Sequence, residues 1–180
     1  GIANETIRKR LVNEFYLRAV ISLHQGVFRP YAGVKTSVLV FDKPLDKINI
    51  ADDSYVWFYD IINDGYNPEK ISQESRVETP GESDIPELLD LWTEYKNSGF
   101  KEPPGIKGLS LLEPGSKLPN NWHINKSVIL NNDYLLSANT YKPTVEEFIS
   151  DEKPEDLIRD LMKIENEVIS GLNQLLKDIK

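Results

Sequence analysis

The sequence predicts an α/β fold, and three observations lead to that prediction. Short apolar segments rich in Val, Ile, Leu and aromatic residues, as strands show, occupy residues 18–23, 35–42 and 54–60. A helical apolar pattern opens the chain, and a longer one closes it from Pro154 onward. The 180 residues, 39% of them hydrophobic and 28% charged, fit a globular domain with a buried core.

The first predicted elements are a helix and a strand. Asn4 is the expected N-cap, and Ile7, Leu11 and Phe15 recur four residues apart on one helical face. The short apolar run of residues 18–23 is typical of a strand that is covered on both faces. Because the chain starts with glycine and enters a helix almost at once, we expect it to be a piece of a longer protein.

Two more strands follow, and the chain then becomes polar. Residues 35–42 are rich in Val, Leu and Phe, and residues 54–60 carry aromatic side chains on both faces. From residue 61 to residue 79 the sequence is polar, with a turn signal at Asp64-Gly65. We therefore expect a loop-rich extension after the third strand.

A second helix is predicted near residues 84–96. Asp84 is its expected N-cap, Pro86 lies in the first turn, and Glu87 completes a pattern like a capping box. Gly and Pro recur through residues 97–121, which predicts a loop.

A short element is expected at residues 127–130, and Thr144 with Glu147 forms another capping-box pattern. We therefore divide the chain into the end of an α/β domain (1–60), a loop-rich extension (61–143) and a helical tail (144–180).

The last helix has the clearest pattern. It is expected to run for about 26 residues, or about 39 Å, with acidic residues near its start and lysines near its end. Its apolar stripe either packs on its own domain or docks on a partner subunit, and the pattern leaves both open. The docking candidates are Leu157, Leu161, Ile164, Val168, Leu172 and Leu175.

Composition and charge exclude several classes of protein. The net charge of −8 argues against a free-standing nucleic-acid binder, although residues 1–47 hold eight Lys/Arg against four Asp/Glu. An uneven solvated surface would explain the same imbalance. Cysteine is absent, which excludes disulfides and thiolate metal sites and fits a cytoplasmic protein. No apolar run approaches a membrane span, and no metal site is expected.

The sequence contains no complete catalytic motif. It lacks GxGxxG, GxxxxGK[ST], HExxH and GxSxG. His24 has no obvious neighbouring nucleophile or carboxylate in sequence, and His123 lies beside Trp122, so we interpret both as structural, through hydrogen bonding and packing respectively.

The order of segments nevertheless resembles a known family. The opening helix, AVISL, GVFRPYAGVKTSVLVFDK and VWFYD resemble the closing part of N6-adenine DNA methyltransferases, most of all the methylation subunit of type I restriction–modification systems. SDIPELLDLW and NDYLLSANTYKP resemble later segments of that family. The resemblance implies the C-terminal portion of a Rossmann-like S-adenosylmethionine-dependent sheet, with an antiparallel hairpin and a long terminal helix.

The chain departs from the family in two motifs. The glycine-containing loop that binds S-adenosylmethionine and the Asn-Pro-Pro-aromatic motif are both absent, and the family places them upstream of the opening helix. The resemblance therefore implies that the intact protein methylates adenine N6 in DNA with S-adenosylmethionine. The chain alone is expected to hold no cofactor and to be inactive.

The resemblance also gives a role to the loop between the first two strands. In the family, an aromatic residue there holds the target base outside the duplex, and Phe28 matches it best, with Tyr31 second. The alternative for Phe28 is a core aromatic that fills the loop.

Other loop residues are expected to serve the same site. Arg29 and Lys35 would meet DNA phosphates, although a solvated strand end is the alternative for Lys35. Gly26 and Gly33 would allow tight turns.

The expected partners are DNA and the specificity and restriction subunits of the same system, with no membrane. The family topology also leaves the outer edge of strand 35–42 unpaired in this chain, so we expect self-association, local rearrangement or the tail to cover it. The alternative function is a non-enzymatic α/β interaction module that assembles through its terminal helix.

Overall fold

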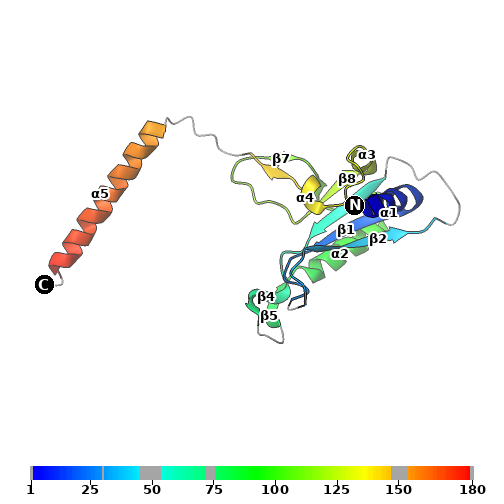
Figure 1. The fold of residues 1–180 in the computed structure, drawn as a ribbon, viewed down its shortest axis with the longest axis horizontal. Coiled ribbons are helices and arrows are strands. Elements are labelled where there is room, and N and C mark those ends of the chain that lie inside the picture. Colours follow the sequence, from blue (N-terminus) through cyan, green and yellow to red (C-terminus); the bar gives the residue numbers. More distant parts are fainter. Residues whose placement is uncertain (1, 30, 45–53, 72–75, 147–153, 179–180) are drawn as a thin grey trace. The chain divides into compact units, whose positions relative to one another are not determined.

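The computed structural model describes residues 2–29, 31–44, 54–71, 76–146 and 154–178. It divides into two compact units, Gly1–Glu146 and Glu147–Lys180. Among the described residues, the first unit holds all the strands, and the second holds one long helix (Figure 1).

The elements follow one another in this order. They are α1 (Ile2–Glu14), β1 (Tyr16–Leu23), β2 (Thr36–Asp42), β3 (Tyr55–Asp60), β4 (Asp64–Ile71), β5 (Arg76–Ser83), α2 (Ile85–Asn97), β6 (Ile106–Lys107), β7 (Leu111–Leu112), β8 (Asn121–Asn125), α3 (Lys126–Leu130), α4 (Ala138–Tyr141), β9 (Thr144–Val145) and α5 (Pro154–Asp178).

A mixed five-stranded sheet, in the order β2-β1-β3-β8-β6, forms the centre of the first unit. β1 is parallel to β3 and antiparallel to β2, which pairs Leu23 with Thr36 and Ser22 with Ser37. The predicted α/β class is confirmed, as are the three strands and the antiparallel hairpin of β1 and β2. Among the described strands β2 is last in the order, so the expectation that its outer edge is covered stays a prediction.

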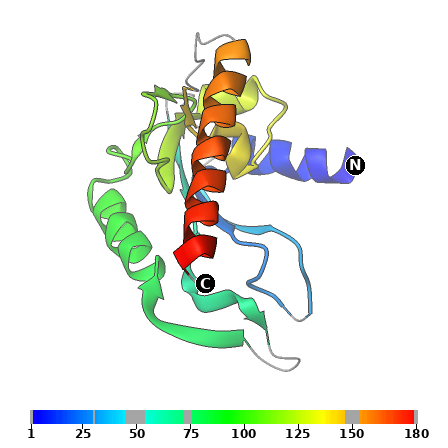
Figure 2. The same cartoon turned by 90° about the vertical axis from the view of Figure 1, so that its left-hand side faces the viewer.

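Helices cover both faces of the sheet, and Figure 2 shows α1 and α2 on opposite sides of it. On the α1 side, Phe58 stacks on Trp122 with ring centroids 6.1 Å apart. On the α2 side, Trp57 and Tyr59 pack with Tyr95. Because successive side chains of a strand point to opposite faces, the aromatic run of β3 supplies both cores. Burial of these large rings is the main stabilising contribution.

The polar stretch 61–79 is where the fold differs most from expectation. Instead of a loop, most of it forms the β4–β5 hairpin, and Asp64 and Gly65 begin β4 rather than turn the chain. Gly65 has φ +89°, a conformation that glycine adopts without strain. The hairpin pairs within itself through polar residues, so the hydrophobic alternation that reveals a strand is missing.

The capping patterns seen in the sequence do not all mark the helix starts as predicted. Asn4 lies inside α1 rather than at its N-cap, and Thr144 lies in β9, while Glu147 is outside the described residues. Asp84 is the N-cap of α2, but its carboxylate accepts from the backbone amides of residues 62 and 63, each at 2.8 Å. The Asp84 carboxylate could accept either from the first backbone amides of α2 or from amides elsewhere in the fold, and in this structure it accepts from the latter.

The remaining expectations concern the loop 97–121 and the last helix. The loop contains the two-residue strands β6 and β7. The terminal helix is confirmed and spans 25 residues. Within the described part of the chain, no helix is long and apolar enough to cross a membrane.

Candidate nucleic-acid interface

The loop from His24 to Lys35 is held by its own hydrogen bonds. The amide of Val27 donates to the carbonyl of His24 at 3.2 Å, and the amide of Arg29 donates to the carbonyl of Gly26 at 3.1 Å. The side-chain Nε2 of Gln25 donates to the Gly33 carbonyl at 2.6 Å, which joins the two ends of the loop. The loop is therefore a defined turn structure at the end of β1.

His24 connects this loop to the hairpin. Its Nδ1 accepts from the amide of Gly26 at 2.9 Å, and its Nε2 lies 3.1 Å from Asp64 Oδ1. The hydrogen-bonding role predicted for His24 is confirmed. His123 packs edge-on against Tyr55, with 5.4 Å between ring centroids, which agrees with the packing role expected of it.

The two candidate aromatic residues lie on this loop with their rings in solvent. Phe28 is 47% exposed and Tyr31 is 94% exposed. A core aromatic that fills the loop would be buried, so the exposure of Phe28 argues against that alternative. The structure leaves the base-contacting role of either ring a prediction.

The two candidate glycines lie in different environments. Gly26 is buried and Gly33 is exposed, and neither has a φ in the left-handed region. A Cβ at Gly33 would first meet Arg29 Nε, at 3.9 Å, which is an ordinary contact. The structure therefore gives no steric reason for glycine at position 33. Arg29 is exposed, as a phosphate contact requires.

Lys35 belongs to a three-residue charge cluster at the carboxyl end of β3. Its Nζ lies 3.1 Å from Asp60 Oδ1, and Lys142 Nζ lies 2.9 Å from Asp60 Oδ2. Asp60 is only 7% exposed. Burial raises the pKa of its carboxyl, but hydrogen bonds and charges from Lys142 and Lys35 outweigh that effect and leave the pKa below its usual value. The alternative for Lys35, a solvated strand end with no specific role, therefore does not describe this side chain fully, because it contacts Asp60.

Sequence reasoning missed three residues at this edge: Ser22, Asp60 and Lys142. The parallel pairing of β1 with β3 places Ser22 beside Asp60 where both strands end. The sequence did contain a signal for Ser22 and Asp60, because each is a polar residue near the end of an apolar strand. The carboxyl ends of parallel strands meet at one sheet edge, so the two residues could have been expected to lie together. Lys142 comes from a distant segment and had no local signal.

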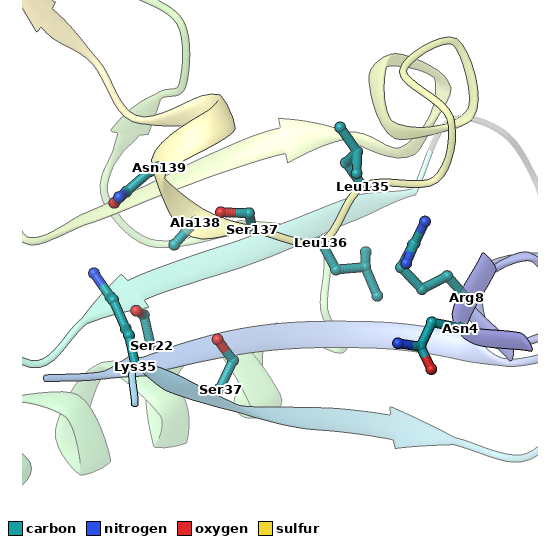
Figure 3. Close-up of a pocket in the computed structure, with 10 residues that line it drawn as sticks. All are labelled: Asn4, Arg8, Ser22, Lys35, Ser37, Leu135, Leu136, Ser137, Ala138 and Asn139. Carbon is teal, nitrogen blue, oxygen red and sulfur yellow. The ribbon is translucent and has the colours of Figure 1, made fainter. Parts of the chain in front are cut away.

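A pocket of 640 Å³ opens on the α1 side of this edge (Figure 3). Its floor includes Ser22 and Ser37, and α1 contributes Asn4 and Arg8. The remaining lining residues are Lys35, Leu135, Leu136, Ser137, Ala138 and Asn139. Two of the ten lining residues are basic and none is acidic, so the pocket suits an anionic ligand.

A family model for N-6 DNA methylases matches residues 1–148. The chain belongs to the N-6 DNA methylase family. The resemblance seen in the sequence is thereby confirmed at the level of the family.

Solved structures similar to this N-6 DNA methylase chain come from restriction–modification systems. One is a chain from a structural study of complex assembly and conformational transition of the type I restriction–modification system. It is 20% identical, with a TM-score of 0.49, and the match covers 99% of this chain and 33% of that one. Another is the type I methyltransferase subunit of Streptococcus thermophilus, with 19% identity and a TM-score of 0.48 over 79% of this chain and 24% of that one. The chain thus spans a third or less of the length of these proteins.

The pocket does not suit the methyl donor. S-adenosylmethionine carries a sulfonium and an ammonium group besides one carboxylate, and the pocket presents Arg8 and Lys35 with no carboxylate among its lining residues to pair with the two cationic groups. We therefore assign no cofactor to this pocket. The described part of the chain also contains no group of three or more His, Cys, Asp or Glu residues that could hold a metal ion.

The docking candidates lie on α5, which forms the second unit. Five of them are more than half exposed; the side chain of the sixth, Leu157, is not among those that the structure describes. These five are Leu161, Ile164, Val168, Leu172 and Leu175. Their docking role stays a prediction.

Proposed function

We propose that this chain is the C-terminal part of a type I restriction–modification methylation subunit that transfers a methyl group from S-adenosylmethionine to adenine N6 in DNA. The observation that carries the proposal is the N-6 DNA methylase match over residues 1–148. In the intact protein the chain completes the sheet, contacts the target base and joins the subunits. Methyl-group transfer itself belongs to the upstream part.

The base contact is assigned to the loop between β1 and β2. An adenine amine is unreachable inside the duplex, so the base must leave the stack and be held between flat surfaces. Phe28 offers a half-exposed ring on a loop that hydrogen bonds hold at the sheet edge. Stacking on such a ring contributes about 1–3 kcal/mol per base. Tyr31, almost fully exposed, is the second candidate.

Phosphate contacts are assigned to Arg29 and Lys35, on either side of Tyr31. Arg29 is exposed, and the Lys35 side chain is 41% exposed even while it contacts Asp60. Phosphate contacts position a protein on DNA without reading its sequence. We therefore expect these residues to affect affinity for all DNA sequences alike.

Subunit assembly is assigned to α5. Its exposed apolar stripe would dock on the specificity subunit, as amphipathic helices dock on apolar grooves. The restriction subunit is the further expected partner of the assembled enzyme.

The central test is Phe28→Ala in the intact methyltransferase, with Tyr31→Ala beside it. We expect Phe28→Ala to lower methylation of target DNA by about 5- to 150-fold, in line with the stacking energy, with nearly unchanged affinity for S-adenosylmethionine. Phe28→Trp retains a flat ring and is expected to keep most activity. Unchanged turnover in Phe28→Ala removes Phe28 from the site, and a larger loss in Tyr31→Ala transfers the role to Tyr31.

The second candidate function is a non-enzymatic interaction module, favoured by the exposed stripe of α5. The coding sequence upstream of residue 1 distinguishes the two. An Asn-Pro-Pro-aromatic motif preceded by a glycine-containing loop supports the methyltransferase. A start codon directly before residue 1 favours the module, because the chain would then have no cofactor site.

A further inference from the structure

The pocket of 640 Å³ has its two cationic side chains at opposite ends. Figure 3 shows Arg8 beside Asn4 at one end and Lys35 at the other, with Leu136 between them. Ser22 and Ser37 face each other across β1 and β2 along the floor. A ligand that fills the pocket thus meets a positive group at each end and hydroxyl groups between.

Both cations are held in place by protein contacts that leave further donors. Arg8 Nε donates to the carbonyl of Tyr134 at 3.0 Å, which uses one of the five N–H donors of a guanidinium. Lys35 Nζ donates to Asp60 at 3.1 Å, which uses one of its three. Preorganised cations bind anions with less loss of side-chain entropy than free ones.

The electrostatics around the pocket favour an anion. The carboxylate that contacts Lys35, Asp60, is shared by Lys35 and Lys142, so this cluster keeps one net positive charge. A second pocket, of 380 Å³ on the α2 side, is lined by Asp84 and Glu87 and has only Lys117 as a cation. Of these two pockets, the first therefore has the positive lining and the second the negative one.

We infer that this pocket binds the phosphate backbone of one DNA strand, with one phosphate at Arg8 and another at Lys35. This inference rests on the proposed function for the presence of DNA. The volume lies within the range of pockets that hold nucleotide-sized ligands. The hydroxyl and amide groups of Ser22, Ser37 and Asn139 suit the phosphate oxygens, and Leu136 offers an apolar surface to the sugar. Lys35 also ends the aromatic loop, so the bound strand lies next to the base-contacting residues.

The test measures how binding of a fluorescein-labelled single-stranded oligonucleotide to the full-length protein depends on salt. A single strand needs no base extrusion, and the salt dependence of its binding reports on phosphate contacts rather than on stacking at Phe28. We expect Arg8→Gln and Lys35→Gln each to weaken binding roughly tenfold and to reduce the slope of log Kobs against log[salt] by about 0.7. Arg10→Gln, which removes the same charge from the same helix, and Lys101→Gln are the matched controls.

Four outcomes decide the inference. Unchanged slopes in Arg8→Gln and Lys35→Gln overturn it, and so does an equal loss in the two controls, which would indicate general attraction. A wild-type salt slope in Lys35→Arg, beside a reduced slope in Lys35→Gln, supports the inference, because it shows that the charge at position 35 matters and that the loss is not a folding defect. Inorganic pyrophosphate that binds as tightly as the oligonucleotide overturns the assignment to a strand. Methylation assays of the same wild-type protein test the proposed function separately, since methylation with unchanged slopes would refute only the pocket.

Discussion

Lys142 Nζ lies 2.9 Å from Asp60 Oδ2, although 82 positions separate the two residues in the chain. Lys35 reaches the other carboxylate oxygen from the aromatic loop. The buried carboxylate therefore joins the end of β3, the loop before β2 and the segment after α4. These are the parts of the chain that surround the candidate pocket, so we expect the cluster to position them.

Asp60→Asn is predicted to destabilise the protein. The change leaves the two lysines without their anion, and the side chain of Lys142 is only 25% exposed. Because Lys35 is 41% exposed and screened by water, we expect most of the loss, about 2–3 kcal/mol, to come from Lys142. Urea denaturation measures it. Glu14→Gln, which breaks the pair of Glu14 with Arg10, whose side chains are 56% and 69% exposed, is the control and is expected to cost less than about 1 kcal/mol. Equal losses in the two variants would contradict the assignment.

The contribution of Asp60 is predicted to depend on pH in the acid range only. Its folded-state pKa lies below the usual value of 3.8, so the unfolded state binds its proton first as pH falls. The stabilisation is fully present above that usual value and is lost as pH falls through the folded-state pKa. The difference in unfolding free energy between wild type and Asp60→Asn is therefore expected to stay constant from neutral pH to about pH 5 and to shrink below about pH 4. A difference that shrinks near neutral pH would point to another group.

His24→Ala is predicted to loosen the aromatic loop without removing it. His24 joins Gly26 to Asp64, at 2.9 Å and 3.1 Å. In the intact methyltransferase, 2-aminopurine at the target position reports on base extrusion by its fluorescence. We expect a smaller response in His24→Ala than in wild type but a larger one than in Phe28→Ala, with unchanged affinity for S-adenosylmethionine. Since His24 contacts Asp64, Asp64→Asn is expected to add little to His24→Ala. Fully additive effects would mean that the two residues act independently.

Gly108→Ala is predicted to strain the core on the α1 side. A Cβ there would lie 2.6 Å from the Tyr141 carbonyl oxygen and 2.8 Å from Trp122 Cδ1. Overpacking of this kind costs about 1–3 kcal/mol, and a lower thermal midpoint measures it. Gly33→Ala, with its nearest atom at 3.9 Å, is expected to change stability by less than about 0.5 kcal/mol. A neutral Gly108→Ala would mean that the backbone of this segment shifts freely.

The sequence predicted the parts of the fold that have a strong hydrophobic pattern. β1, β2 and β3 are apolar runs, and α5 repeats apolar residues at helical spacing, so both were visible without a structure. The β4–β5 hairpin was not, because Tyr66 pairs with Glu78 in a strand pair with few apolar residues. Local polarity cannot separate such a hairpin from a loop.

The candidate site was predictable only in part, for a related reason. The aromatic loop follows directly from one short segment, so Phe28 and Lys35 could be named from the sequence. The pocket also needs Arg8 from α1 and Asn139 from far along the chain. Which distant segments meet at a sheet edge depends on strand order, and neither composition nor periodicity specifies that order.

Replacement of the α5 stripe by serine is predicted to impair assembly rather than folding. Leu161, Ile164 and Val168 are each more than half exposed, so their loss removes little packing within the second unit. In the intact methyltransferase, we expect Leu161→Ser and Ile164→Ser each to weaken binding of the specificity subunit at least about tenfold, as buried interface anchors do. Lys163→Ser, which lowers helix propensity similarly but lies off the stripe, is the control. If the stripe variants instead lower the thermal midpoint of the protein alone and leave subunit binding intact, α5 packs on its own domain and the docking assignment is wrong.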